Sequence, residues 1–114
     1  MRTTLEDGEA IAAEGATHPR VTLDGMLGKI VCEHYFTAGE ATGFCGGAGL
    51  DVLTICILEL ANGWTLVGKS APASPENFDA EKGRVFARDD ALRQLWPLEG
   101  YALRERLHLD ALTH

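Results

Sequence analysis

The chain has 114 residues, of which 46% are hydrophobic, and its formal net charge is −7. This length predicts one domain that can bury its own core. The acidic balance argues against nonspecific binding to nucleic acid, which requires a basic surface. No apolar run approaches the ~18 residues that span a bilayer, and the pattern of a secretory signal is missing. We therefore expect a cytoplasmic protein without a membrane partner.

The first third of the chain predicts an arm followed by one helix. Residues 1–20 are rich in Glu, Gly, Ala and Thr, which is typical of a flexible N-terminal arm. Apolar residues then recur at helical spacing from Leu23, Thr22 can cap this helix, and we expect it to end near Glu33 or His34.

A loose segment and a hairpin come next. Tyr35 and Phe36 begin a strand or a turn, and residues 37–49 contain five glycines. This segment lacks the Gly-Lys-Ser/Thr ending of a phosphate loop, so it is either a variable surface loop or a flap in which Phe44 stacks on a ligand.

Asn62-Gly63 separates two β-type runs, residues 52–60 and 64–70. This arrangement favours a hairpin with a type I′ turn. Both faces of the first strand are largely apolar, so we expect it to be central or covered on both sides.

The last third predicts two helices. Asp79 can cap a long helix that runs to about Leu95, and Pro97 disfavours its continuation. A short helix over 98–107 and a tail over 108–114 follow. The predicted fold class is α+β, in one domain over 21–107. It has an N-terminal helix, an antiparallel hairpin or small three-stranded sheet, and two C-terminal helices.

The long helix carries two apolar stripes. One is a row of mostly small residues, and the other is bulkier. We expect one stripe to pack on the sheet and the other on a partner, with the small row serving either packing within the chain or a dimer seam. The small row is Ala80, Gly83, Ala87, Ala91 and Leu95, and the bulky stripe is Phe78, Val85, Leu92 and Trp96.

Six of the ten basic residues lie between 82 and 106. Arg84 and Arg88 are four residues apart, where like charges repel on a helix. Surface pairs could offset this repulsion, either Glu81 with Arg84 or the acidic pair at 89–90 with Arg93. A ligand phosphate or carboxylate could do so as well, because a guanidinium binds both well.

The three cysteines, Cys32, Cys45 and Cys56, fit neither a disulfide framework nor a zinc pattern. We expect buried, reduced thiols and predict no metal and no cofactor.

Phrases in the second half resemble those of a known family of small phage proteins, grouped with gene forty-nine of phage N-four and gene sixty-six of phage Sf-six. The similarity covers roughly residues 21–107. This chain departs from the family in its acidic N-terminal arm and in a longer glycine-rich loop. The resemblance implies phage or prophage origin, expression in a bacterial cytoplasm and no assigned enzymatic activity. The residues that carry the resemblance are Leu60-Ala61-Asn62-Gly63-Trp64, Gly68-Lys69-Ser70-Ala71, Asn77-Phe78-Asp79, Gly83, Ala87, Asp90-Ala91 and Leu95-Trp96-Pro97-Leu98-Glu99-Gly100-Tyr101.

Together these features predict a non-enzymatic phage accessory protein that sequesters a small anionic ligand, such as a nucleotide immune signal, and assembles as a homodimer or higher oligomer. The alternative is an inhibitor that acts by contact with a host protein, and a nucleotide-modifying enzyme is a third reading. No catalytic residue is predicted. The predicted ligand-binding residues are Arg84, Arg88, Phe44, Tyr35 and Trp64.

Overall fold

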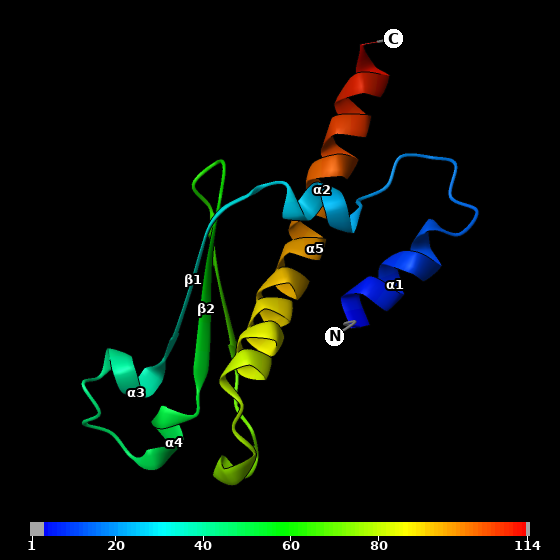
Figure 1. The fold of residues 1–114 in the computed structure, drawn as a ribbon. Helices are drawn as coiled ribbons and strands as arrows, with labels where there is room; N and C mark the ends of the chain where they lie inside the picture. Colours follow the sequence, from blue (N-terminus) through cyan, green and yellow to red (C-terminus); the bar gives the residue numbers. More distant parts are fainter. Residues whose placement is uncertain (1–3, 114) are drawn as a thin grey trace.

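The computed structural model describes residues 4–113. A three-stranded antiparallel sheet, in the order β1-β2-β3, lies against one long helix, α5 (Figure 1). This arrangement confirms the α+β class and the three-stranded form of the sheet. The elements are α1 (Thr4–Ala13), α2 (Leu23–Leu27), β1 (Ile30–Thr37), α3 (Ala38–Ala41), α4 (Ala48–Asp51), β2 (Thr54–Leu60), β3 (Thr65–Ser70), a 3-10 turn (Pro75–Asn77) and α5 (Ala80–Leu112).

The predicted N-terminal helix is much shorter than expected. The Thr22 hydroxyl caps it as predicted, accepting a hydrogen bond from the Gly25 N–H at 3.0 Å. The helix ends at Leu27, however, and β1 begins at Ile30. Two glycines weaken this short segment as a helix, and the β-branched residues that follow suit the pleated surface of a sheet. The prediction of helix to His34 was therefore wrong.

The hairpin between β2 and β3 is confirmed, but its turn differs from the predicted type. The Gly63 N–H donates to the Leu60 carbonyl at 2.8 Å, and the Leu60 N–H donates to the Trp64 carbonyl at 2.9 Å. Gly63 has φ +89°, whereas Asn62 does not have a positive φ. These bonds define a three-residue loop that ends in a left-handed glycine. The turn is not type I′, because that type needs positive φ angles at two consecutive residues.

The central strand β2 is covered on one face only. Thr54, Cys56, Leu58 and Leu60 are buried on the side that faces α5. The opposite face carries Ile55, Ile57 and the neighbouring Val67, which is 54% exposed. The alternative that β2 is central is confirmed, and within residues 4–113 no second layer covers its other face.

The row of small residues on α5 serves packing within the chain. Ala87 and Ala91 are fully buried, and Gly68 of β3 lies directly against them. A Cβ atom at Gly68 would stand 2.0 Å from the Ala87 carbonyl oxygen and 2.5 Å from the Ala91 nitrogen. Helix and strand backbones are therefore in close contact, which only a glycine at this position allows.

Pro97 does not end the long helix. The helix runs without interruption from Ala80 to Leu112, so the prediction of two C-terminal helices was wrong. Pro97 lacks an N–H and so leaves one backbone carbonyl without its helical donor. Good helix formers continue the chain beyond it. The Lys29 ammonium pairs with Glu99 and ties this second half to the segment after α2.

Replacing Pro97 with alanine is expected to raise the free energy of unfolding by roughly 1–3 kcal/mol, because it restores a backbone hydrogen bond and removes a steric conflict. Urea denaturation followed by circular dichroism measures this change. A helix that is interrupted at Pro97 in solution would instead give a variant of unchanged stability.

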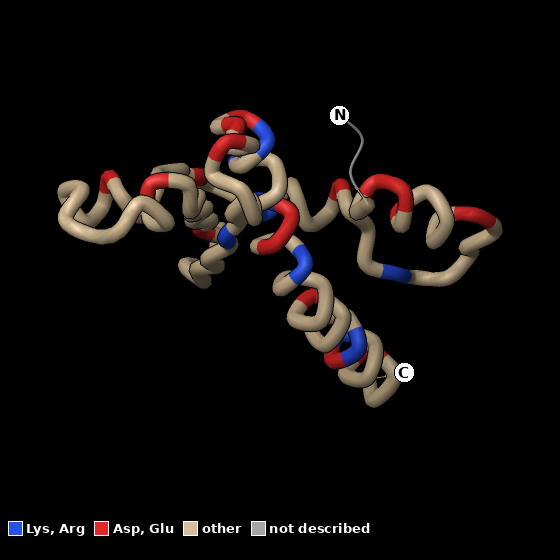
Figure 2. Tube along the Cα trace, turned by 90° about the horizontal axis from the view of Figure 1, so that it is seen from below, with Lys and Arg blue, Asp and Glu red and all other residues tan. Residues whose placement is uncertain are grey.

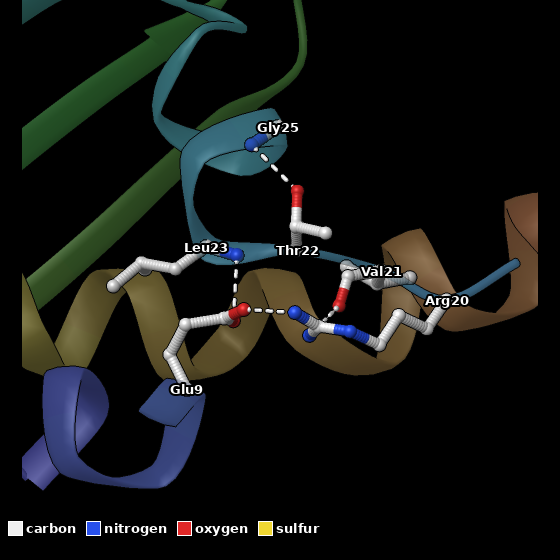
Figure 3. A network of polar contacts seen from close by, with 6 residues as sticks. All are labelled: Glu9, Arg20, Val21, Thr22, Leu23 and Gly25. Carbon is white, nitrogen blue, oxygen red and sulfur yellow. Dashed lines mark hydrogen bonds and ion pairs between the residues drawn. The ribbon is translucent and has the colours of Figure 1, made fainter. Parts of the chain in front are cut away.

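The N-terminal segment contains a docked helix. Leu5 of α1 belongs to the buried core. Glu9 accepts hydrogen bonds from the Arg20 guanidinium at 2.6 Å and from the Leu23 N–H at 2.8 Å (Figure 3). This network lowers the pKa of Glu9, mainly through the bond from Arg20, and joins α1 to the start of α2. The flexibility of residues 1–20 in solution stays a prediction.

The cysteines follow the expected pattern only in part. Cys56 is buried in the core, whereas Cys32 and Cys45 are exposed, which corrects the expectation of three buried thiols. Among residues 4–113 no three His, Cys, Asp or Glu side chains are grouped as a metal site would require. No helix in the same range has the length and apolar character of a membrane span.

Candidate functional site

The candidate site is a hollow at the end of the sheet where β1 leads into α3. Its volume is about 290 Å³. Three predicted site residues from separate segments line it: Tyr35 from β1, Phe44 from the glycine-rich loop and Arg84 from α5. The other lining residues are Phe36, Thr37, Glu40, Asp51, Thr54, Phe78 and Ala80.

Phe44 is presented by an unusual turn in the loop between α3 and α4. Its backbone has φ +59°, directly after Gly43 with φ +66°. A non-glycine residue in this region is uncommon and costs free energy. The Phe44 N–H donates to the Gly39 carbonyl at 2.8 Å, which holds the turn. The ring remains 66% exposed, so an aromatic surface is offered to solvent beside the hollow.

The two predicted arginines have different surroundings. Arg88 binds Glu33 of β1 in a bidentate pair, with Nε 2.9 Å from Oε1 and Nη2 3.4 Å from Oε2. Arg84 is exposed at the rim of the hollow, and none of the ion pairs formed within residues 4–113 includes it. Because the Arg84 guanidinium is not paired with a carboxylate of the described chain, it is available to bind an external anion.

Neither predicted surface pair on α5 is among the ion pairs formed within residues 4–113. Burial raises the pKa of Asp89, although the charge of Arg93 acts to lower it. Arg93 hydrogen-bonds the Thr4 hydroxyl. The Asp90 carboxylate accepts from the Lys69 N–H at the outer edge of β3 at 2.9 Å. The sheet balances one charge of the helix, that of Arg88, through Glu33, and Figure 2 shows basic residues at intervals along α5.

A polar cluster lies beside the hollow on the covered face of β1. The Tyr35 hydroxyl donates to Glu33 at 2.7 Å. Burial, together with this bond, raises the pKa of Tyr35 far above its usual range. Burial acts to raise the pKa of Glu33, but the bonds from Arg88 and Tyr35 outweigh it and the pKa falls. Burial also raises the pKa of the Cys56 thiol, which keeps it protonated and weakly nucleophilic.

The Glu33 cluster predicts a dependence of stability on pH. Because folding lowers the pKa of Glu33 below its ordinary value of 4.5, its contribution is fully present above that value. It disappears as the pH falls through the lowered, folded-state pKa. In urea denaturation the wild type should be more stable than Glu33→Gln by a constant amount between about pH 5 and 7, with the gap narrowing below pH 4.5. A gap that is the same at pH 3 and pH 6 would contradict this assignment.

Trp64 lies apart from the other predicted site residues. It follows the hairpin turn, whereas the hollow is built where β1 ends and β2 begins. Trp64 is half exposed, and the structure does not bring it to the hollow.

Sequence reasoning missed several residues of the hollow. Glu40 lies in α3, inside the glycine-rich segment, and Asp51 is the last residue of α4, just after that segment. No sequence pattern marked either residue. Phe78 could have been predicted as a site residue, because it is the middle residue of the phrase Asn77-Phe78-Asp79. It also lines a second, smaller hollow of about 190 Å³, together with Lys82 and Phe86.

Two residues of the phrases quoted above position the long helix on the sheet: Gly68 of β3 lies against Ala87, and Asp79 caps the helix by accepting a hydrogen bond from the Lys82 N–H. The chain belongs to the Phage protein (N4 Gp49/phage Sf6 gene 66) family, whose model matches residues 21–107. No curated protein and no solved structure matches the chain.

Proposed function

We propose that this phage protein binds a small aromatic anion of the nucleotide class in the hollow beside β1 and holds it without altering it. One observation carries the proposal: Tyr35, Phe44 and Arg84 come from a strand, a loop and the long helix and line the same hollow. Exposed rings stack on bases at about 1–3 kcal/mol per base, and a guanidinium binds phosphate.

The charges of the hollow favour a ligand with one phosphate. Arg84 is the cation of the lining, and Glu40 and Asp51 supply two carboxylates. A polyphosphate would be repelled by these carboxylates, whereas ribose hydroxyls or base amino groups can donate hydrogen bonds to them. The volume of about 290 Å³ is at the small end of ligand sites, which suits a mononucleotide.

The biological role that we propose is sequestration of a nucleotide signal in the cytoplasm of the bacterial host. Membership of a phage family supports this role, because a phage gains from removing a signal that the host uses in defence. Sequestration requires binding only.

Calorimetry against AMP, GMP, CMP, UMP and their cyclic forms tests the proposal. We expect at least one to bind, and Phe44→Ala to weaken that binding about tenfold, in line with the loss of one stacking contact. Trp64→Ala is the matched control, since this aromatic residue is exposed but lies outside the hollow, and it should bind normally. No binding of any nucleotide at millimolar concentration would overturn the proposal. A ligand recovered chemically changed would point to an enzyme.

The uncovered face of the sheet supports the second candidate function, contact with a host protein. The outer edge of β3 is closed by α5, because Asp90 and Gln94 bond the backbone of Lys69 and Val67. Within the described residues nothing closes the outer edge of β1 in the same way, and the apolar face at Ile55 and Ile57 lies beside it. Open edges and apolar faces are ready templates for a partner. Stoichiometric capture of one host protein by the wild type, lost in Ile57→Lys and retained in Phe44→Ala, would favour this reading.

A further inference from the structure

The C-terminal half of α5 carries an apolar surface that the rest of the described chain leaves open. The helix extends beyond the sheet (Figure 1), and the molecule is elongated, with extents of 59 × 29 × 18 Å. Leu98, Tyr101, Leu109 and Leu112 are between 44% and 71% exposed. With Leu107, which is 42% exposed on the opposite side of the helix, they are more than the isolated exposures expected on a monomer.

Leu98, Tyr101, Leu109 and Leu112 form one stripe along the helix. At 100° per residue, they lie within a sector of about 100° together with Ala102 and Glu105. We call these six residues the tail stripe. The same line continues toward the N-terminus through Ala91 and Ala87, which the sheet covers. The tail stripe is therefore the extension of the sheet-packing face into a region that the sheet does not reach.

The four large apolar residues of the tail stripe are placed symmetrically about Glu105. Tyr101 and Leu109 are each four residues from it, and Leu98 and Leu112 are each seven residues from it. A symmetric dimer interface requires a surface that complements itself when rotated by 180°. We propose that two copies of this chain pair through antiparallel tail stripes, with Glu105 at the two-fold axis. Leu98 then packs on the partner's Leu112, and Tyr101 packs on the partner's Leu109.

The direction of pairing follows from the position of the sheet. A parallel partner would bring its own body to the level of the first copy's sheet, on the side that this sheet already occupies. An antiparallel partner places its body at the C-terminal end of α5, away from the first copy's sheet (Figure 1). The two-fold axis brings the two Glu105 carboxylates toward each other. Arg104 and Arg106, the residues on either side of Glu105 in the chain, are the cations that can offset this repulsion.

The size of the seam predicts a modest affinity. Residues 98–112 span roughly 21 Å of helix, which is less contact than a standard interface of about 800 Å² per partner provides. We expect a dissociation constant in the micromolar range. The inference does not depend on nucleotide binding.

Disulfide trapping tests the register. In a background of Cys32→Ser and Cys45→Ser, which removes the two exposed thiols, Glu105→Cys should form a covalent dimer under mild oxidation. Leu112→Cys alone should not do so, whereas a mixture of Leu98→Cys and Leu112→Cys proteins should. Cross-linking of Leu112→Cys to itself would overturn the antiparallel register, and failure of Glu105→Cys to cross-link would overturn the pairing.

Sedimentation supplies the second test. Wild type should shift from monomer to dimer as its concentration rises through the micromolar range, and Leu109→Glu should remain monomeric. Leu107→Glu is the matched control, because this exposed leucine lies on the opposite side of α5 and should dimerise normally. Circular dichroism and thermal melting verify that both variants fold. Two results would overturn the proposal. One is a dimer that persists in Leu109→Glu. The other is a wild type that remains monomeric at about 100 times the expected dissociation constant, roughly 500 μM.

Discussion

Gly68→Ala is expected to lower the free energy of unfolding by about 3 kcal/mol or to prevent folding. The added Cβ would meet the Ala87 carbonyl oxygen at 2.0 Å and the Ala91 nitrogen at 2.5 Å. Both contacts are backbone atoms of the long helix, so neither can rotate away. The helix would have to move off the sheet, and the core between them would lose contacts. Urea denaturation followed by circular dichroism measures the loss.

Gly100→Ala is the control for this substitution. Gly100 also belongs to α5, but a Cβ there would meet no atom within 4 Å. Alanine is the better helix former, so this change should raise the free energy of unfolding by about 0.5–1 kcal/mol. The two identical substitutions should therefore act in opposite directions. Equal effects of both would show that the close contact at Gly68 does not set the position of the helix.

The sequence allowed the parts of the fold that depend on short-range patterns to be predicted. Asn62-Gly63 indicated the hairpin because a tight turn needs a residue with positive φ, and Gly63 has one. Asp79 indicated the start of the long helix because its carboxylate can reach the Lys82 N–H, which it does at 3.0 Å. The spacing of Ala87 and Ala91 indicated a close contact, although not which strand would make it.

The errors arose where distant parts of the chain override local preference. Ile30 and Val31 continue the helical spacing that begins at Leu23, but pairing with β2 makes residues 30–34 part of a strand. A proline usually ends a helix, but α5 continues through Pro97. Lys29 binds Glu99, two residues after the proline. Neither outcome can be inferred without knowing which segments meet in space.

The candidate site shows the same division. Residue type singled out Tyr35, Phe44 and Arg84, and the structure places all three around one hollow. Residue type could not separate Arg84 from Arg88, because the carboxylate of Glu33 that binds Arg88 is 55 residues away in the chain. The register of β1 decides which arginine is paired, and that register follows from the fold.

The two arginines should therefore respond differently to replacement by alanine. In Arg88→Ala the partly buried Glu33 carboxylate loses its cation and keeps only the hydrogen bond from the Tyr35 hydroxyl. The expected loss is about 1–2 kcal/mol of unfolding free energy. Arg84→Ala removes an exposed side chain that forms no ion pair in the described structure. Its effect on stability should stay within about 0.5 kcal/mol.

Nucleotide binding should show the opposite order. Loss of a charge-assisted bond from Arg84 to a phosphate is worth about 1.5–3 kcal/mol, which corresponds to a roughly 10- to 100-fold weaker affinity. Arg88→Ala should bind within a few-fold of wild type at temperatures where it is folded. A double substitution, Arg88→Ala with Glu33→Gln, should recover part of the lost stability, because the carboxylate that lost its cation is also removed. The opposite result would be loss of binding in folded Arg88→Ala with normal binding in Arg84→Ala. It would show that Arg88 leaves Glu33 to bind the ligand, so Arg88 and not Arg84 would be the ligand-binding arginine.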